Sequence, residues 1–201
     1  MRPSIYARVL LVCATATVST GVRAQTRFPE PRFDVGVTYS PEHTQLAPGS
    51  CNCFWLQGGG VESAVSLWKG FGIAGSVSSE RLSDYSNGVD FNRFTYTAGL
   101  GYRRNFGGRI QIFGHGLGGR AHAFQGAFPS STGLLSTANS LAVQTGGGLD
   151  LPFSNRFAVR LLEAEYVRTQ LPNGYANTQN DLRLSVGMTL RFGSYRGTGS
   201  R

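Results

Sequence analysis

The chain has 201 residues, with 28 Gly, 13 Phe and 8 Tyr, and 19 Lys and Arg against 11 Asp and Glu. This length suits one domain or a small barrel. The formal charge of +8 could suit a nucleic-acid partner, but the basic residues are scattered rather than clustered, which argues against nucleic-acid binding. No run of about 18 apolar residues occurs after the start of the chain, so no membrane-spanning helix is expected.

The first residues are typical of an export signal. Arg2 and Arg8 give a positively charged start, and a short apolar stretch runs from Val9 to Val18. Small residues then precede a cleavage point expected after Ala24. We therefore predict a signal peptide over 1–24, a periplasmic lead-in over 25–31, a barrel over 32–192 and a short periplasmic tail over 193–201.

Eight later segments alternate between apolar and small or polar residues, as half-buried strands do. They are Arg32–Tyr39, Phe54–Trp68, Phe71–Ser79, Phe91–Arg104, Arg109–Phe124, Ser140–Leu151, Phe157–Thr169 and Asp181–Phe192. No helical periodicity of useful length competes with them.

Short and long connections between these segments alternate. The short ones are 69–70, 105–108 and 152–156, and the long ones are 40–53, 80–90, 125–139 and 170–180. This rhythm is typical of outer-membrane barrels, in which periplasmic turns are short and external loops are long. The predicted fold is all-β: an eight-stranded antiparallel up-and-down transmembrane β-barrel with short periplasmic turns and four longer extracellular loops.

The two faces of the strands differ in a way that sets their orientation. One face is aliphatic and aromatic, whereas the other is Gly, Ala, Ser and Thr with isolated charges. The second face has too few Lys, Glu and Asp for an ordinary water-exposed surface, so we place it inside the barrel and the apolar face against lipid. The charges expected inside are Asp34, Glu62, Arg103, Asp150, Arg160, Glu163, Glu165, Arg183 and Arg191.

These interior charges must pair or stay hydrated. Asp150 and Arg160 flank the same turn, so we expect them to pair near the periplasmic mouth. An eight-stranded barrel is only wide enough for side chains to fill it, which favours a plugged interior. A polar channel or gate is the alternative.

Aromatic residues gather at both ends of the segments, as expected for side chains at the two membrane interfaces. The belt beside the short turns contains Phe33, Trp68, Phe71, Tyr102, Phe106, Phe153, Phe157 and Phe192. The belt towards the long loops contains Tyr39, Trp55, Phe91, Phe94, Phe124 and Tyr175. The outward leucines and valines between these belts would meet the hydrocarbon.

The seventh segment breaks the alternation. If Arg160 faces the interior, strict alternation turns Glu163 and Glu165 towards lipid, which is costly in the middle of a membrane. We therefore predict a β-bulge near Leu161 and Leu162 that returns both glutamates to the interior.

The last strand carries a local motif. Ser185, Gly187, Leu190 and Phe192 fit a polar-x-Gly-x-x-apolar-x-aromatic pattern. In this motif and in its architecture the chain resembles the small eight-stranded outer-membrane barrels, namely the outer-membrane protein A-like transmembrane domain and its opacity-protein relatives. The resemblance covers about 33–192 and implies recognition of these four residues by the outer-membrane assembly machinery. It departs from the family after Phe192, where a Gly/Ser/Arg tail follows.

Two further groups of residues could carry chemistry. Cys51 and Cys53 could form a local disulfide in an oxidising compartment, with free thiols as the alternative; a zinc site is unsupported because only His43 lies near them. His43, His115 and His122 are the available histidines. We expect His43 in a loop and His115 in the middle of a strand, facing inwards, and no Ser or Glu spacing around His122, near the rim, resembles the known barrel enzymes. We expect no metal, no cofactor and no catalysis.

These observations predict a non-enzymatic integral protein of a Gram-negative-type outer membrane. Its role would be structural or one of surface interaction through the external loops, whose ligand the sequence does not indicate. A narrow pore for ions or small solutes is the runner-up, and a lipid A-modifying enzyme is a third hypothesis. The expected partners are outer-membrane lipid, lipopolysaccharide and the assembly machinery, and we expect a monomer. Arg81, Arg93 and Arg168 near the outer rim could meet lipopolysaccharide phosphates.

Overall fold

A computed structural model describes residues 28–45, 53–86, 89–106, 109–131, 133–174 and 177–193. The predicted signal peptide, Cys51 and the tail after residue 193 lie outside these ranges, as does the side chain of Cys53. The expected signal cleavage and disulfide therefore stay predictions. Among the described residues, no helix is long and apolar enough to cross a membrane.

All regular structure in the described residues is antiparallel β-strand. The strands are β1 Phe33–Tyr39, β2 Glu42–Gln45, β3 Cys53–Trp68, β4 Phe71–Ser86, β5 Val89–Phe106, β6 Ile110–Ser130, β7 Gly133–Pro152, β8 Phe157–Thr169 and β9 Gln179–Phe192. Each strand from β3 to β8 pairs with the next in the chain.

The sheet closes into a ring of eight strands. β1 and β2 follow one another along the same position, since both pair with β3 on one side and with β9 on the other. Ser40 and Pro41 separate them, and Pro41 has no N–H to donate to the ladder. The break stays bonded to both neighbours: the Ser40 N–H donates to Gly58 O at 2.9 Å, and Pro41 O accepts from the Leu184 N–H at 3.0 Å.

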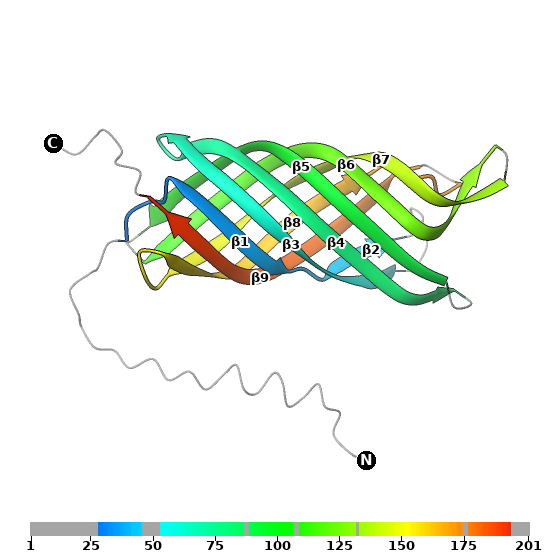
Figure 1. Cartoon of the computed structure of the whole chain (residues 1–201), viewed down its shortest axis with the longest axis horizontal. Helices are drawn as coiled ribbons and strands as arrows, with labels where there is room; N and C mark the ends of the chain where they lie inside the picture. The colour runs from blue at the N-terminus through cyan, green and yellow to red at the C-terminus, as the bar shows by residue number, and fades with distance from the viewer. Residues whose placement is uncertain are drawn as a thin grey trace, which may run out of the picture.

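The ring forms a long cylinder whose two ends differ (Figure 1). The start of β1, the end of β9 and the short turns β3–β4, β5–β6 and β7–β8 lie together at one end, here called the terminal end. The connections β4–β5, β6–β7 and β8–β9 lie at the opposite, distal end. The β6–β7 hairpin extends beyond the rest of the cylinder there.

Two of the predicted long loops are mostly strand. The expected loop over 80–90 is divided between β4 and β5, and the expected loop over 125–139 is divided between β6 and β7. These segments lack a regular alternation of apolar and polar residues, by which a strand is recognised, yet their backbones continue the ladder. The expected loop over 40–53 is shortened by β2, and the connection between β8 and β9 stays closest to its predicted length.

The bulge in β8 is present where the sequence predicts it. Along β7, Asp150 pairs with Arg160 whereas Leu149 pairs with Leu162, so Leu161 is the extra residue. Leu161 and Leu162 are both exposed outwards. Beyond them the phase is reset, and both Glu163 and Glu165 are buried inside.

The barrel is apolar outside and polar inside, the reverse of a water-soluble barrel. Leu100 is 74% exposed and Val37 is 61% exposed on the outer face, whereas Glu80 and Glu163 are fully buried within. An outer face of this kind loses no hydration of polar groups when it meets hydrocarbon. The sequence prediction of the fold class is confirmed.

Aromatic side chains at the terminal end form contacting pairs on the outer surface. Phe33 stacks on Phe192 with ring centroids 5.7 Å apart, across the seam where the first strand meets the last. Phe71 lies 4.8 Å from Tyr102, and Phe153 lies 6.0 Å from Phe157. Trp68 and Phe106 are exposed at the same end.

The belt predicted towards the distal end needs one correction. Phe91 does not face outwards with Phe94, because it lies at an odd position of β5, whose odd positions turn inwards in this half of the strand. It packs against a buried cluster instead. Tyr39, Trp55 and Phe94 are exposed on the outer face, and Tyr175 lies outside the described residues.

Candidate functional site

The barrel interior holds most of the acidic residues that the structure describes. The nine interior charges of the sequence analysis all lie inside. Eight of the nine are buried, and the Glu62 side chain is 15% exposed. Glu42, Glu80, Arg93 and Asp181 join them, all fully or almost fully buried. Arg93 is thus an interior residue, which corrects its expected place at the rim facing lipopolysaccharide.

Nearest the terminal end, Arg160 is the centre of a buried cluster. Its Nε donates to Asp150 Oδ1 at 3.0 Å, and its Nη1 donates to Glu163 Oε2 at 2.9 Å and also to Glu62. The guanidinium lies over the Phe113 ring, 4.1 Å from the centroid. The expected Asp150–Arg160 pair is therefore one contact of a larger group.

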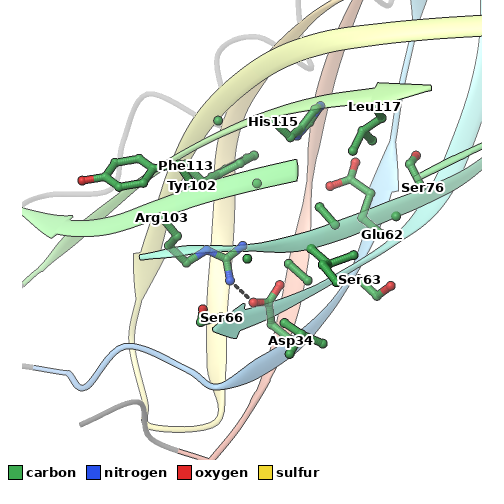
Figure 2. A pocket seen from close by; sticks show the side chains of 18 of the residues that line it. Asp34, Glu62, Ser63, Ser66, Ser76, Tyr102, Arg103, Phe113, His115 and Leu117 are labelled. Atoms are coloured by element: carbon green, nitrogen blue, oxygen red, sulfur yellow. Dashed lines mark hydrogen bonds and ion pairs between the residues drawn. The ribbon is translucent and has the colours of Figure 1, made fainter. Parts of the chain in front are cut away.

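Arg103 extends this cluster towards the terminal mouth. It pairs with Asp34 and lies 4.0 Å from the carboxylate of Asp150. Figure 2 shows Arg103 and Asp34 pointing towards one another from opposite walls. The charges near this mouth are thus satisfied mainly by each other.

A second cluster fills the distal half. Arg93 contacts Glu42, Glu80 at 3.3 Å and Asp181 at 3.0 Å. Arg183 contacts Glu42 at 2.9 Å and Glu80 at 2.7 Å. Two guanidiniums thus share three carboxylates from β2, β4 and β9. Sequence reasoning missed this cluster because it placed Glu42 and Glu80 in loops.

His115 and two glutamates join the two clusters in the middle of the barrel. His115 Nε2 lies 2.8 Å from Glu165 Oε1, and His115 Nδ1 lies 3.8 Å from Glu163 Oε1. Glu165 also lies 3.5 Å from Arg183 of the distal cluster, and Glu163 contacts Arg160. Polar and charged contacts therefore run without a break along the inside of the barrel.

A cavity of about 40 Å³ lies beside this network in the terminal half. Its lining includes Asp34, Glu62, Arg103, His115 and Arg160 (Figure 2). A volume of about 10–15 Å³ is enough to hold one water, so this space suits a few waters rather than a solute.

A small apolar cluster lies at the distal end. Ala123, Phe128, Ala138 and Leu171 are buried together, and Phe91 packs against them. Phe128 and Ala138 come from the β6–β7 hairpin, and Leu171 comes from the segment after β8. The cluster thus packs the hairpin against the β8–β9 connection.

The other histidines lack the partners that catalysis requires. The His122 ring contacts the Asn139 side chain at 2.8 Å on an exposed surface, and the His43 ring packs against Trp55 with centroids 5.1 Å apart. General acid–base catalysis needs a histidine within hydrogen-bond reach of a reacting group. Neither His43 nor His122 contacts a Ser, Asp or Glu in the part of the chain that the structure describes.

The residues of the predicted assembly motif have clear places in β9. Ser185 is buried and its Oγ donates to Ser40 Oγ at 2.9 Å. A Cβ added at Gly187 would lie 2.2 Å from Val37 O, so glycine allows the closest approach at the seam. Leu190 and Phe192 are exposed on the outer face. Recognition of the four by the assembly machinery stays a prediction.

A closed eight-stranded barrel with an apolar exterior and a charged interior defines the class of small outer-membrane β-barrels. The chain matches the family described as the outer membrane protein beta-barrel domain over residues 10–192. It belongs to this family and is an outer-membrane β-barrel protein. The terminal end is therefore periplasmic and the distal end extracellular.

Solved structures of small outer-membrane proteins share this fold. Ail, the attachment invasion locus protein of Yersinia pestis, in complex with the heparin analogue sucrose octasulfate, has a TM-score of 0.56 and 20% identity; the match covers 81% of this chain and 99% of Ail. Neisserial surface protein A has a TM-score of 0.56 and 13% identity, with coverage of 80% and 97%. None of the curated proteins compared with the chain is significantly similar to it.

Proposed function

We propose that this protein is a closed, non-enzymatic barrel that acts by surface interaction at its extracellular end. The observation that carries the proposal is the continuous network of polar and charged contacts along the interior, from Arg93 to Arg103. Together with the apolar cluster at the extracellular end, this network supports a barrel whose interior is filled by side chains. Such a barrel acts through the surface that it exposes on the extracellular side.

The β6–β7 hairpin is the element that this proposal assigns to interaction. It extends beyond the other strands (Figure 1), and near its turn Leu134 is 73% exposed and Leu135 is 50% exposed. Exposed leucines beyond the membrane have no lipid to cover them, which marks a contact surface. Ail, of the same fold, is a protein of attachment and invasion by its name.

Single-channel conductance in planar bilayers tests the closed barrel. Refolded protein that shows a heat-modifiable gel mobility should give no steady conductance. Steady channels would replace this proposal by the narrow pore. Incubation with lipopolysaccharide followed by mass spectrometry of lipid A tests the enzyme hypothesis, and unchanged lipid A is expected.

Lipopolysaccharide is the partner proposed for the outward arginines. Arg120 is exposed on the outer face at the middle of β6, and Arg168 is exposed on the outer face next to the distal end of β8. They lie close in the sheet, because their partners on β7 are Leu141 and Val143. Guanidiniums bind phosphate groups strongly.

Replacement of Arg120 and Arg168 by Ser together should lower the lipopolysaccharide retained after purification in mild detergent. The matched control is Arg156→Ser, which removes an exposed arginine from the periplasmic turn before β8. Equal retention by both variants and the wild type would remove this partner from the proposal.

A further inference from the structure

The side chains at the middle of the barrel meet because the strand between them carries glycine. His115 of β6 and Glu165 of β8 both pair with Gly146 of β7. Glu163 pairs in the same way with Gly148. With no side chain at either glycine, groups from two non-neighbouring strands come into contact. A Cβ at Gly146 would lie 2.9 Å from Glu165 Cγ, and one at Gly148 would lie 2.9 Å from Glu163 Cα.

We propose that His115, Glu163 and Glu165 form a binding site for a divalent transition-metal ion such as zinc at the centre of the barrel. Each residue offers one ligand atom, and these atoms all lie within 4.8 Å of one another. Zinc bonds of about 2.0–2.1 Å place two ligand atoms of a tetrahedral site about 3.3 Å apart. The distances are 2.8 Å from Glu165 Oε1 to His115 Nε2 and 3.8 Å from Glu163 Oε1 to His115 Nδ1, on the other edge of the ring. Because one imidazole binds one ion through one nitrogen, the His115 ring and the Glu163 side chain must rotate to bring all three ligand atoms to the ion.

The two glutamates are oriented as metal ligands are. Glu163 Oε2 lies 2.9 Å from Arg160, and Glu165 Oε2 lies 3.5 Å from Arg183. The Oε1 atom of each glutamate faces His115. Outer partners that fix a ligating carboxylate are a regular part of metal sites. The arginines thus hold the far oxygens and leave the near ones for an ion.

One near oxygen has no donor to satisfy it. Glu163 Oε1 is fully buried and accepts no hydrogen bond from any group in the described ranges of the chain. A buried carboxylate oxygen without a partner costs free energy. Glu163 is fully buried and its Oε1 atom points at His115. This oxygen is therefore an unused ligand atom at the centre of the cluster.

The charge balance of the interior independently favours a cation. In the part of the chain that the structure describes, eight carboxylates lie inside against five guanidiniums. The carboxylates are Asp34, Glu42, Glu62, Glu80, Asp150, Glu163, Glu165 and Asp181, and the guanidiniums are Arg93, Arg103, Arg160, Arg183 and Arg191. Uncompensated charge is expensive in such a setting, and a divalent ion at the centre offsets most of the excess.

The donor set selects the kind of ion. Calcium and magnesium prefer oxygen ligands alone, whereas one imidazole with two carboxylates suits zinc and its neighbours in the transition series. Three protein ligands leave a coordination position open. The adjoining cavity of about 40 Å³, which His115 also lines, has room for the water that would fill it.

Zinc binding by the refolded, tag-free protein in detergent micelles tests the site. Cys51 and Cys53 are replaced by Ser in every sample, so that thiols do not bind the metal. Titration calorimetry with zinc chloride at neutral pH should show one ion per barrel, and cobalt chloride should give the visible absorption bands of a low-coordinate site. The bound ion should also raise the urea midpoint of unfolding.

Two variants should lose the site and one should keep it. His115→Asn and Glu163→Gln should each weaken zinc binding at least tenfold and abolish the cobalt bands. The control His122→Asn removes an exposed histidine of the same strand and should bind as the wild type does. A heat-modifiable gel mobility verifies that each variant folds. Glu163→Gln keeps the size of the side chain, so this variant still tests the site if His115→Asn does not fold.

Two results would overturn the proposal. If the wild type binds no zinc, the excess carboxylates carry protons rather than an ion. If His115→Asn binds zinc as tightly as the wild type, the ion lies elsewhere on the chain.

Discussion

Replacement of Arg160 by Met removes the guanidinium that contacts Asp150, Glu62 and Glu163. Methionine keeps much of the side-chain length but supplies no charge and no donor. Among the ion pairs of the described residues, Asp150 then keeps the Arg103 contact at 4.0 Å, and Glu163 keeps His115 at 3.8 Å.

Removing one partner of a buried ion pair costs about 3–5 kcal/mol, because the other charge is left uncompensated. Arg160 is only 2% exposed, so this range applies rather than the value of about 0–1 kcal/mol for a surface pair. With a slope of about 2 kcal/mol per molar urea, the midpoint of unfolding should fall by about 2 M.

The assay is urea unfolding of the refolded protein in lipid vesicles, followed by tryptophan fluorescence. Trp55 and Trp68 are both exposed on the outer face, so their emission reports the loss of lipid contact. Arg156→Met, at an exposed position of a turn, is the matched control and should change the free energy of unfolding by less than about 0.5 kcal/mol. A loss below about 1 kcal/mol for Arg160→Met would show that water screens the interior and would refute the closed network.

Three further changes test separate features. Gly146→Val should destabilise the barrel by about 1–3 kcal/mol through overpacking, since its Cβ would lie 2.4 Å from a backbone oxygen; an unchanged urea midpoint would contradict the close approach there. Phe192→Asp should reduce the amount of barrel in the outer membrane of cells more than it lowers the stability of refolded protein. Normal levels of this variant in the membrane would contradict the predicted assembly signal. Phe128→Ala removes the largest side chain of the apolar cluster at the distal end, so limited proteolysis should cut the β6–β7 hairpin faster while the barrel stays intact; equal cleavage rates would show that the cluster does not stabilise the hairpin.

The part of the fold inside the bilayer could be predicted because lipid imposes a strict alternation on it. The bulge in β8 shows how far this reasoning reaches. Glu163 and Glu165 are out of phase with Arg160, and few backbone arrangements keep all three side chains away from lipid. The structure inserts one extra residue, Leu161, which turns both glutamates inwards.

Beyond the bilayer the same reasoning fails. A strand that leaves the membrane meets water on its outer face, so its residues need not alternate, and the ends of β4 and β6 resemble loops in composition. Glu80 was misplaced for this reason, whereas Arg93 lies in a segment that was predicted as a strand and was assigned to the rim against the phase of that strand. Glu80 and Arg93 both lie at inward positions of their strands, as Ser76, Ser78 and Thr95 do. This alternation was the sequence signal from which their inward orientation could have been predicted.

The central cluster was missed for another reason. Sequence patterns relate residues on the same or adjacent strands, but His115 and Glu165 lie two strands apart and meet only over Gly146. Glycines at inward positions of a middle strand are the clue. They mark the places where side chains from the two flanking strands can touch.

The seam between β1 and β9 has a consequence for the order of folding. Because the first strand pairs with the last, the ring cannot close until the ribosome has released nearly the whole chain. Until then β1 and the newest strand both present unpaired N–H and C=O groups, which are templates for aggregation. Contacts between the two ends of a chain also form slowly. A truncated chain lacking β9 would therefore be a persistent open sheet rather than a smaller barrel, and its survival would depend on proteins that hold open edges apart.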